Sequence, residues 1–150
     1  MAMGCSLKLA PALWVLLIVF ILRVVSQMLV AAGVAPFLPP MEAWQSGLLP
    51  YPVLVMCQIV VITIYGKVCL DFTRGRGFFV QPRRGLGVGL LVFGSIYFGV
   101  MILRFIILLS HPGEHWMGGP LPIVFHWLLA AFLLLVGSYH IGELRRSKFY

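Results

Sequence analysis

Four long hydrophobic stretches alternate along the chain with short segments that contain polar residues, prolines and glycines. The stretches cover residues 10–32, 51–70, 86–110 and 121–144. Each is long enough to cross a bilayer as an α-helix, which takes about 20 apolar residues. Because the connections are short, consecutive helices are expected to lie antiparallel. The pattern predicts an all-α integral membrane protein, with residues 1–150 forming a single four-helix transmembrane domain in an up-down-up-down bundle.

The composition agrees with a membrane domain and excludes a soluble one. Hydrophobic residues make up 61% of the 150 residues, charged residues only 10%, and the mean hydropathy is +1.04. A soluble domain of this size leaves much of its surface in water, so it could not cover so much apolar surface. No CxxC pair occurs among the three cysteines, and we therefore expect neither thiol redox chemistry nor a zinc site built from cysteines.

The basic residues predict how the helices are oriented. The net charge is +7, and two of the 11 Lys and Arg residues lie deep within predicted helices. The other nine lie in the terminal segments or in and beside the second connection: Lys8, Lys67, Arg74, Arg76, Arg83, Arg84, Arg145, Arg146 and Lys148. Since cytoplasmic loops are enriched in Lys and Arg, we predict cytoplasmic termini, in a bacterial inner (plasma) membrane. This distribution explains the basicity without a nucleic-acid partner.

The first connection, residues 33–50, is the longest, and it is rich in apolar and aromatic residues. Pro39 and Pro40 are expected to open a short helix that Gly47 closes. Trp44 and Tyr51 are typical of the aromatic belt at a membrane boundary. We interpret the connection as lying on the outer surface, either as an interfacial anchor or as a lid over a polar site.

Five polar side chains lie inside the predicted helices at similar depth: Arg23, Gln27, Gln58, Arg104 and His126. With a rise of about 1.5 Å per residue, they lie roughly 7–13 Å below the outer ends of their helices. A polar side chain at membrane depth is costly and usually faces a partner, a cavity or a ligand. We therefore predict that these five residues form a ligand-binding site in the outer half of the bundle.

Helical periodicity places further residues beside this site. Seven residues nearly complete two turns, so Tyr97 is expected on the same helix face as Arg104. On the last helix, His126, Ala130 and Gly137 form a narrow stripe of small residues below the histidine. Such a stripe allows another helix or a flat ligand to approach closely.

The two arginines of this layer suggest the chemistry of the ligand. No carboxylate lies at their depth, because the outer acids Glu42 and Glu114 fall in connections. An anionic amphiphile, with a lipid phosphate or a carboxylate, would supply the missing charge. A quinone would use the same donors as hydrogen bonds. In the competing structural interpretation, the polar residues only join helices. We expect an accessory protein or complex subunit, with membrane lipid, a quinone, a membrane protein or a second copy as partner.

A first alternative is an electron-transfer subunit that carries b-type haem. His126 and His140 are 14 residues apart, so they share a face of the last helix at a separation of about 21 Å. This spacing loosely resembles the paired histidines of two-haem membrane cytochromes. Each haem also needs a second axial ligand, and the first three predicted helices contain no histidine. The remaining candidates for that ligand are a loop histidine or a methionine: His111, His115, Met56 and Met101.

A second alternative is an enzyme that acts on a lipid-linked substrate. His126 would exchange a proton with the substrate, while Arg23 and Arg104 would stabilise developing negative charge. Against this interpretation, the sequence contains no paired carboxylates, no nucleophile motif and no phosphate-binding loop.

Overall fold

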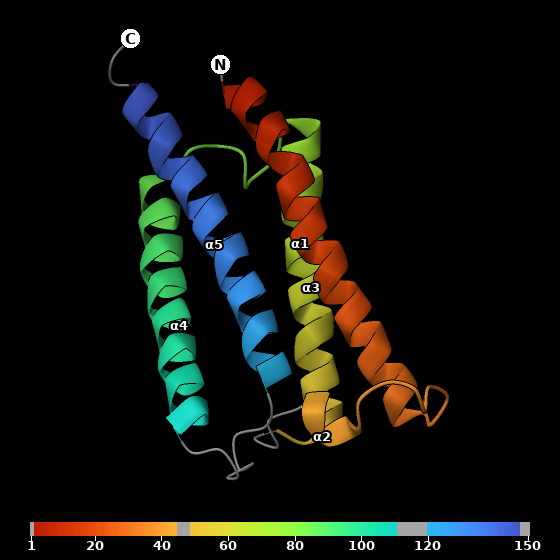
Figure 1. The fold of residues 1–150 in the computed structure, drawn as a ribbon. Helices are drawn as coiled ribbons and strands as arrows, with labels where there is room; N and C mark the ends of the chain where they lie inside the picture. Colours follow the sequence, from red (N-terminus) through yellow and green to blue (C-terminus); the bar gives the residue numbers. More distant parts are fainter. Residues whose placement is uncertain (1, 45–48, 111–119, 148–150) are drawn as a thin grey trace.

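The computed structural model describes residues 2–44, 49–110 and 120–147, and this part of the chain is helical apart from its connections. It contains four long helices and one short one (Figure 1): α1 (Ala2–Ala31), α2 (Met41–Trp44), α3 (Tyr51–Arg74), α4 (Arg84–Ser110) and α5 (Pro120–Arg146). All four long helices are long and apolar enough to cross a membrane. The prediction of an all-α protein with four helices long and apolar enough to span a membrane is confirmed, and these helices fit a multi-pass membrane protein.

The helices extend beyond the hydrophobic stretches that predicted them, most clearly at the end of α3. The prediction stopped at residue 70, whereas α3 continues through Asp71 to Arg74. Gly75 then adopts the left-handed conformation (φ 60°) and ends the helix, as glycine commonly does at this position. The limit of a hydrophobic stretch marks where the side chains meet water, and the backbone can remain helical beyond that limit.

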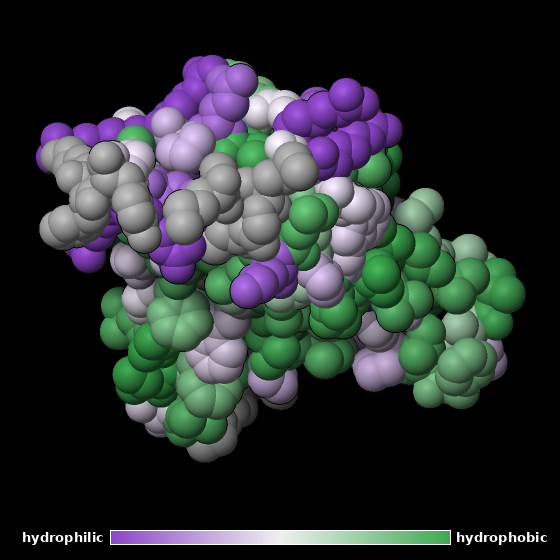
Figure 2. Space-filling model, turned by 90° about the horizontal axis from the view of Figure 1, so that it is seen from above, coloured by the Kyte–Doolittle hydropathy of each residue, from purple (hydrophilic) through white to green (hydrophobic). Residues whose placement is uncertain are grey.

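The start of α1 and the end of α5 lie at the same end of the molecule, which we call the terminal end, and α2 lies at the opposite end, the α2 end (Figure 1). Figure 2 shows the terminal end from above, and hydrophilic residues gather there. Within the bundle, α1 packs along α3 and also contacts α5, and α4 packs along α5.

Glycines allow α4 and α5 to approach closely. A Cβ atom added to Gly87 would lie 2.8 Å from the Cβ atom of His140, and one added to Gly137 would lie 3.1 Å from the Gly87 carbonyl oxygen. The stripe that contains Gly137 was predicted to admit a close neighbour, and α4 is that neighbour. Small residues at helix contacts are the usual means of close packing in membranes.

The buried core lies toward the terminal end and includes Leu13 and Leu17 of α1. Aromatic rings connect α3 with α5 there: Tyr65 stacks on Phe132 with centroids 3.9 Å apart. Phe72 of α3 also meets Tyr139 of α5 edge-on, with centroids 4.8 Å apart. The same large side chains that join α3 to α5 keep their backbones further apart than those of α4 and α5.

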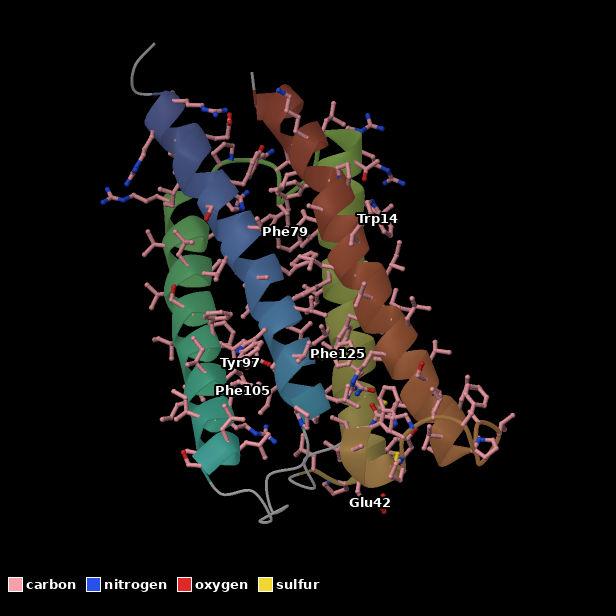
Figure 3. The ribbon with its side chains drawn as sticks, viewed as in Figure 1. Trp14, Glu42, Phe79, Tyr97, Phe105 and Phe125 are labelled. Atoms are coloured by element: carbon pink, nitrogen blue, oxygen red, sulfur yellow. The ribbon has the colours of Figure 1, made fainter. Side chains whose placement is uncertain are left out.

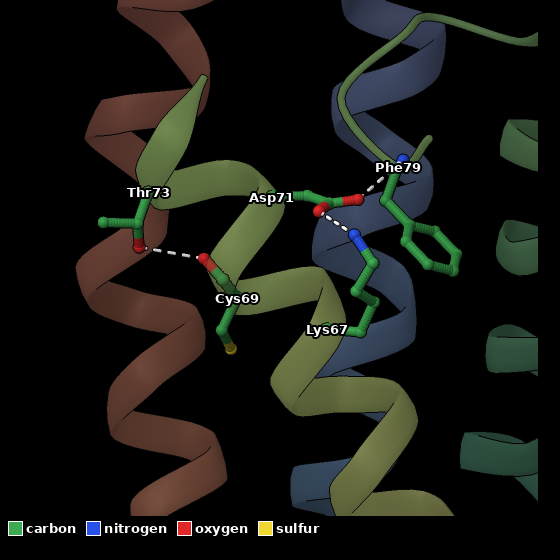
Figure 4. Close-up of polar contacts among 5 residues, drawn as sticks. All are labelled: Lys67, Cys69, Asp71, Thr73 and Phe79. Carbon is green, nitrogen blue, oxygen red and sulfur yellow. Dashed lines mark hydrogen bonds and ion pairs between the residues drawn. The ribbon is translucent and has the colours of Figure 1, made fainter. Parts of the chain in front are cut away.

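A buried carboxylate fixes the connection between α3 and α4 (Figure 4). The side chain of Asp71 is paired with Lys67 and accepts a hydrogen bond from the Phe79 backbone N–H at 3.4 Å. Gly77 lies directly against the same carboxylate with a positive φ of 132°, where a side chain would be both strained and obstructed. Asp71 is therefore a structural residue that ties the connection back to α3.

Candidate functional site

A cavity of about 540 Å³ lies between the four long helices and Trp44. Tyr97 and Phe125, which line it, lie in the half of the bundle nearer α2 (Figure 3). Most of the wall is apolar or aromatic, including Phe20, Leu54, Val61, Met101, Phe125 and Leu129. Five polar side chains interrupt this wall: Arg23, Gln58, Tyr97, Arg104 and His126.

The structure brings four of the five predicted site residues to this one cavity. The exception is Gln27, which is fully buried behind the wall, where its Oε1 accepts a hydrogen bond of 3.0 Å from Nε2 of Gln58. Gln27 therefore positions the amide of Gln58 and does not line the cavity. Tyr97 is a polar wall residue that the prediction placed near the site but did not include in it.

Arg23 is the most deeply buried charge in the cavity wall, with only 8% of the residue exposed. Its Nη2 donates a hydrogen bond of 2.6 Å to the carbonyl oxygen of Trp44. Its guanidinium carbon lies 5.6 Å from the centroid of the Phe125 ring. Within the described part of the chain, its Nε–H is buried without a hydrogen-bond partner, and Arg23 takes part in neither of the two ion pairs. The cavity wall therefore contains a cation whose counter-charge is missing among the described residues.

Tyr97 of α4 and His126 of α5 form a hydrogen-bonded pair at the cavity wall, through the Tyr97 hydroxyl and Nδ1 of the imidazole. Arg23 and Arg104 line the same cavity as this pair. Which partner holds the proton depends on the histidine tautomer. The seven-residue spacing of Tyr97 and Arg104 predicted their common face, but the partner across the helix contact could not be read from one helix.

The amides of Gln58 and Gln27 leave hydrogen-bonding capacity unused. Gln58 Oε1 and Gln27 Nε2 are both buried without a partner in the described structure. Exchanging the oxygen and nitrogen of both amides would preserve their mutual hydrogen bond and still leave one atom unused on each. Gln58, which lines the cavity, therefore offers a hydrogen bond to an occupant in either assignment.

Trp44 closes the cavity at the α2 end. It is 7% exposed, lines the cavity, and is fixed by a hydrogen bond of 2.9 Å from its Nε1 to the carbonyl oxygen of Pro39. Its backbone carbonyl holds Arg23, as described above. Of the two interpretations of the first connection, these contacts favour a lid. The predicted end of the short helix, Gly47, lies outside the described residues.

His140 lies outside the cavity and does not share a site with His126. It is fully buried, its Nδ1 accepts a hydrogen bond of 3.3 Å from the backbone N–H of Arg83, and its Cβ occupies the close contact with Gly87. Its Nε2 is buried without a hydrogen-bond partner among the described residues. His126 and His140 therefore lie in different surroundings, His126 at the cavity wall and His140 in the contact between α4 and α5.

The other candidate axial ligands divide into three cases. Met101 lines the cavity together with His126, whereas Met56 is 63% exposed on α3 and is not part of the wall. Two candidates lie outside the described residues: His111 and His115. Among the described residues, no group of three His, Cys, Asp or Glu side chains is arranged to hold a metal ion.

Comparison of the chain with protein-family models, with curated proteins and with solved structures found no match.

Proposed function

We propose that this multi-pass membrane protein binds an amphiphile with an anionic head group in the cavity between its helices. The head group carries a phosphate or a carboxylate, and its hydrocarbon part lies against the apolar wall. In the orientation that we propose, the terminal end is cytoplasmic and the cavity lies in the outer half of a bacterial inner membrane. The distribution of Lys and Arg supports this orientation.

The single observation that carries the proposal is the environment of Arg23. A buried cation without an opposite charge is costly, so it is normally compensated by a partner or a ligand. The guanidinium is held in place by the Trp44 carbonyl but keeps an unused Nε–H. A phosphate or carboxylate accepts such hydrogen bonds with favourable geometry, often from two nitrogen atoms at once. An anionic head group would provide both the charge and the acceptor.

The remaining wall suits the other half of an amphiphile. Ligand pockets typically measure about 300–1,000 Å³ and combine apolar walls with a few polar groups, and the cavity agrees on both counts. Arg104 adds a second positive charge to the wall. The cavity is enclosed by spanning helices, so a ligand that is already dissolved in the bilayer is the natural occupant.

The experiment is mass spectrometry of the small molecules that remain bound to the protein after purification in detergent. We expect an anionic lipid or fatty acid with the unaltered protein, and a loss of most of it in Arg23→Gln. The matched control is Arg76→Gln, which removes an exposed arginine outside the cavity and should leave retention unchanged. Size-exclusion elution checks that each variant is folded. Equal retention by Arg23→Gln and Arg76→Gln would contradict the proposal and support the interpretation in which Arg23 only joins helices.

A quinone is a second candidate ligand, favoured by the Tyr97–His126 pair. A quinone carbonyl accepts hydrogen bonds, and this pair presents a hydroxyl and an imidazole beside an aromatic wall. Competition between decylubiquinone and dioctanoyl phosphatidic acid separates the two ligands. Tighter binding of the quinone would favour this second candidate.

In the same preparation, a Soret band would support the haem alternative, with His126 and Met101 as the axial ligands that the cavity offers.

A further inference from the structure

A second hollow, of about 560 Å³, lies between α4 and α5 at the terminal end of the bundle. It shares no lining residue with the polar cavity. Arg84 of α4 and Arg145 of α5 border it, and we call these two residues the groove arginines. The remaining wall is aliphatic: Val88, Leu91, Val92, Ile141 and Leu144. The hollow therefore combines two cations from different helices with an apolar groove.

The groove arginines have charge available for a ligand. Both are exposed, and neither takes part in an ion pair among the described residues. Their neighbours in the sequence are engaged differently. Arg146 is paired with Glu143 at 3.1 Å, and the guanidinium of Arg83 lies over the Phe78 ring, 4.1 Å from its centroid. Within the described ranges, no ion pair or ring contact of this kind engages the two arginines that border the hollow.

The aliphatic wall lies where hydrocarbon would reach it. Val88 and Val92 are 45% and 54% exposed, one helical turn apart and on the same side of α4. The glycine contacts between α4 and α5 close the base of the groove, because Gly87 and Gly137 bring the two backbones together. A chain that lies in this groove would contact both helices along its length.

We propose that this groove binds one anionic phospholipid, with its phosphate between Arg84 and Arg145 and one acyl chain along the aliphatic wall. Basic pockets between spanning helices at the membrane boundary are suited to anionic head groups. Guanidinium groups bind phosphate through charge-assisted hydrogen bonds. The site is independent of the cavity at the α2 end, so it stands or falls separately from the proposed function.

Native mass spectrometry of the full chain, titrated with two lipids that share the same acyl chains, tests the proposal. Dioleoyl phosphatidylglycerol should bind more tightly than dioleoyl phosphatidylcholine. In the double variant Arg84→Gln and Arg145→Gln, the affinity for phosphatidylglycerol should fall roughly 10- to 30-fold, because each basic residue near an anionic head group contributes about a factor of five. The control, Arg74→Gln with Arg76→Gln, makes the same charge change on and just beyond the end of α3 and should lose much less.

A second pair of variants tests the aliphatic wall without changing the charge. Val88→Trp fills the groove and should remove the tightest phosphatidylglycerol site. Ile96→Trp places the same side chain on an exposed position of α4 that does not line the groove, and it should preserve the site. Three results would each overturn the proposal: equal affinity for the two lipids, equal losses in the two double variants, or the same binding in both tryptophan variants.

Discussion

Arg23 combines two roles that compete for the same side chain. One nitrogen holds the Trp44 carbonyl at 2.6 Å, while another is buried without a partner among the described residues. A hydrogen bond from a charged donor is typically worth about 1.5–3 kcal/mol, which favours a closed Trp44. An anion that bound to the guanidinium would compete with this carbonyl. Ligand binding and the position of Trp44 are therefore expected to be coupled through one guanidinium group.

Cys57 provides a direct probe of whether the cavity is occupied. It is an exposed free cysteine that lines the cavity, whereas Cys69 is fully buried in the core. In a Cys5→Ser background, we expect N-ethylmaleimide to label Cys57 and not Cys69. Dioctanoyl phosphatidic acid should slow the labelling at least several-fold, because an occupant covers the thiol. The readout is the rate of mass increase, with peptide mapping of the site.

Dioctanoylglycerol is the matched control for this labelling, because it has the same chains without the phosphate. It should protect Cys57 much less. Equal protection by the two lipids would show that the hydrocarbon alone determines binding, contrary to the role given to Arg23.

At the residue scale, depth could be predicted from the sequence and pairing could not. The helical rise of about 1.5 Å per residue placed Arg23, Gln58 and Arg104 in one layer, and the structure puts all three in one cavity wall. The partners Tyr97 and His126 lie on different helices, so their contact depends on how α4 and α5 rotate against each other. No periodicity within a single helix contains that information.

At the element scale, the close contact of α4 and α5 rests on glycine at particular positions. Gly87→Ala should destabilise the protein by about 1–3 kcal/mol, because the new methyl group would meet the Cβ atom of His140 in a packed interface. Gly89→Ala is the matched control on the same helix, with nothing within 4 Å of the added atom. It should be neutral or stabilise by up to about 1 kcal/mol, since alanine favours helix. Thermal unfolding in detergent measures both, and similar changes in the two variants would contradict the assigned packing.

The segment around α2 is the element that closes the cavity. We expect Trp44→Ala to raise the dissociation rate of dioctanoyl phosphatidic acid by about tenfold or more, because it removes a buried wall residue and loosens the backbone that holds Arg23. Trp14→Ala is the control, since Trp14 lies outside the cavity wall, toward the terminal end (Figure 3), and bonds to Thr73. Stopped-flow dilution gives both rates. An unchanged rate in Trp44→Ala would return the segment to a simple interfacial role.

The hydrophobic pattern predicted which elements form but not how the segments between them fold back. The four long helices follow directly from stretches of apolar residues. The Trp44 carbonyl contacts Arg23, 21 positions away, and the Asp71 carboxylate contacts Phe79, 8 positions away. Both contacts involve connecting segments, in which the hydrophobic pattern is weak. The burial of His140 likewise results from its contact with Gly87, a contact between helices that hydropathy does not encode.

At the scale of the whole molecule, the buried core and the polar cavity occupy opposite ends of the bundle. Core side chains such as Leu13, Phe72 and Val136 lie toward the terminal end, and the cavity lies toward the α2 end. At the terminal end these side chains join α1, α3 and α5, and toward the α2 end the four long helices border the cavity. The main buried cluster and the polar cavity thus lie in different halves of the protein.

The proposed orientation predicts which end reacts with reagents that do not cross membranes. In a background with all native cysteines changed to serine, Val34→Cys at the α2 end should react in intact cells with a membrane-impermeant maleimide. Ser147→Cys at the terminal end should react only after the cells are opened. Both positions are exposed, so access to the reagent and not burial decides the outcome. The reverse pattern would invert the orientation and place the cavity in the cytoplasmic half.

The enclosure of the cavity by spanning helices also affects how its affinity should be expressed. A hydrophobic ligand partitions into the lipid phase before it meets the protein, so its abundance there, as a mole fraction of total lipid, governs occupancy. Apparent affinities measured in detergent would consequently vary with the amount of micelle present. Saturation curves in vesicles of fixed size and graded ligand content would give a quantity that can be compared between laboratories.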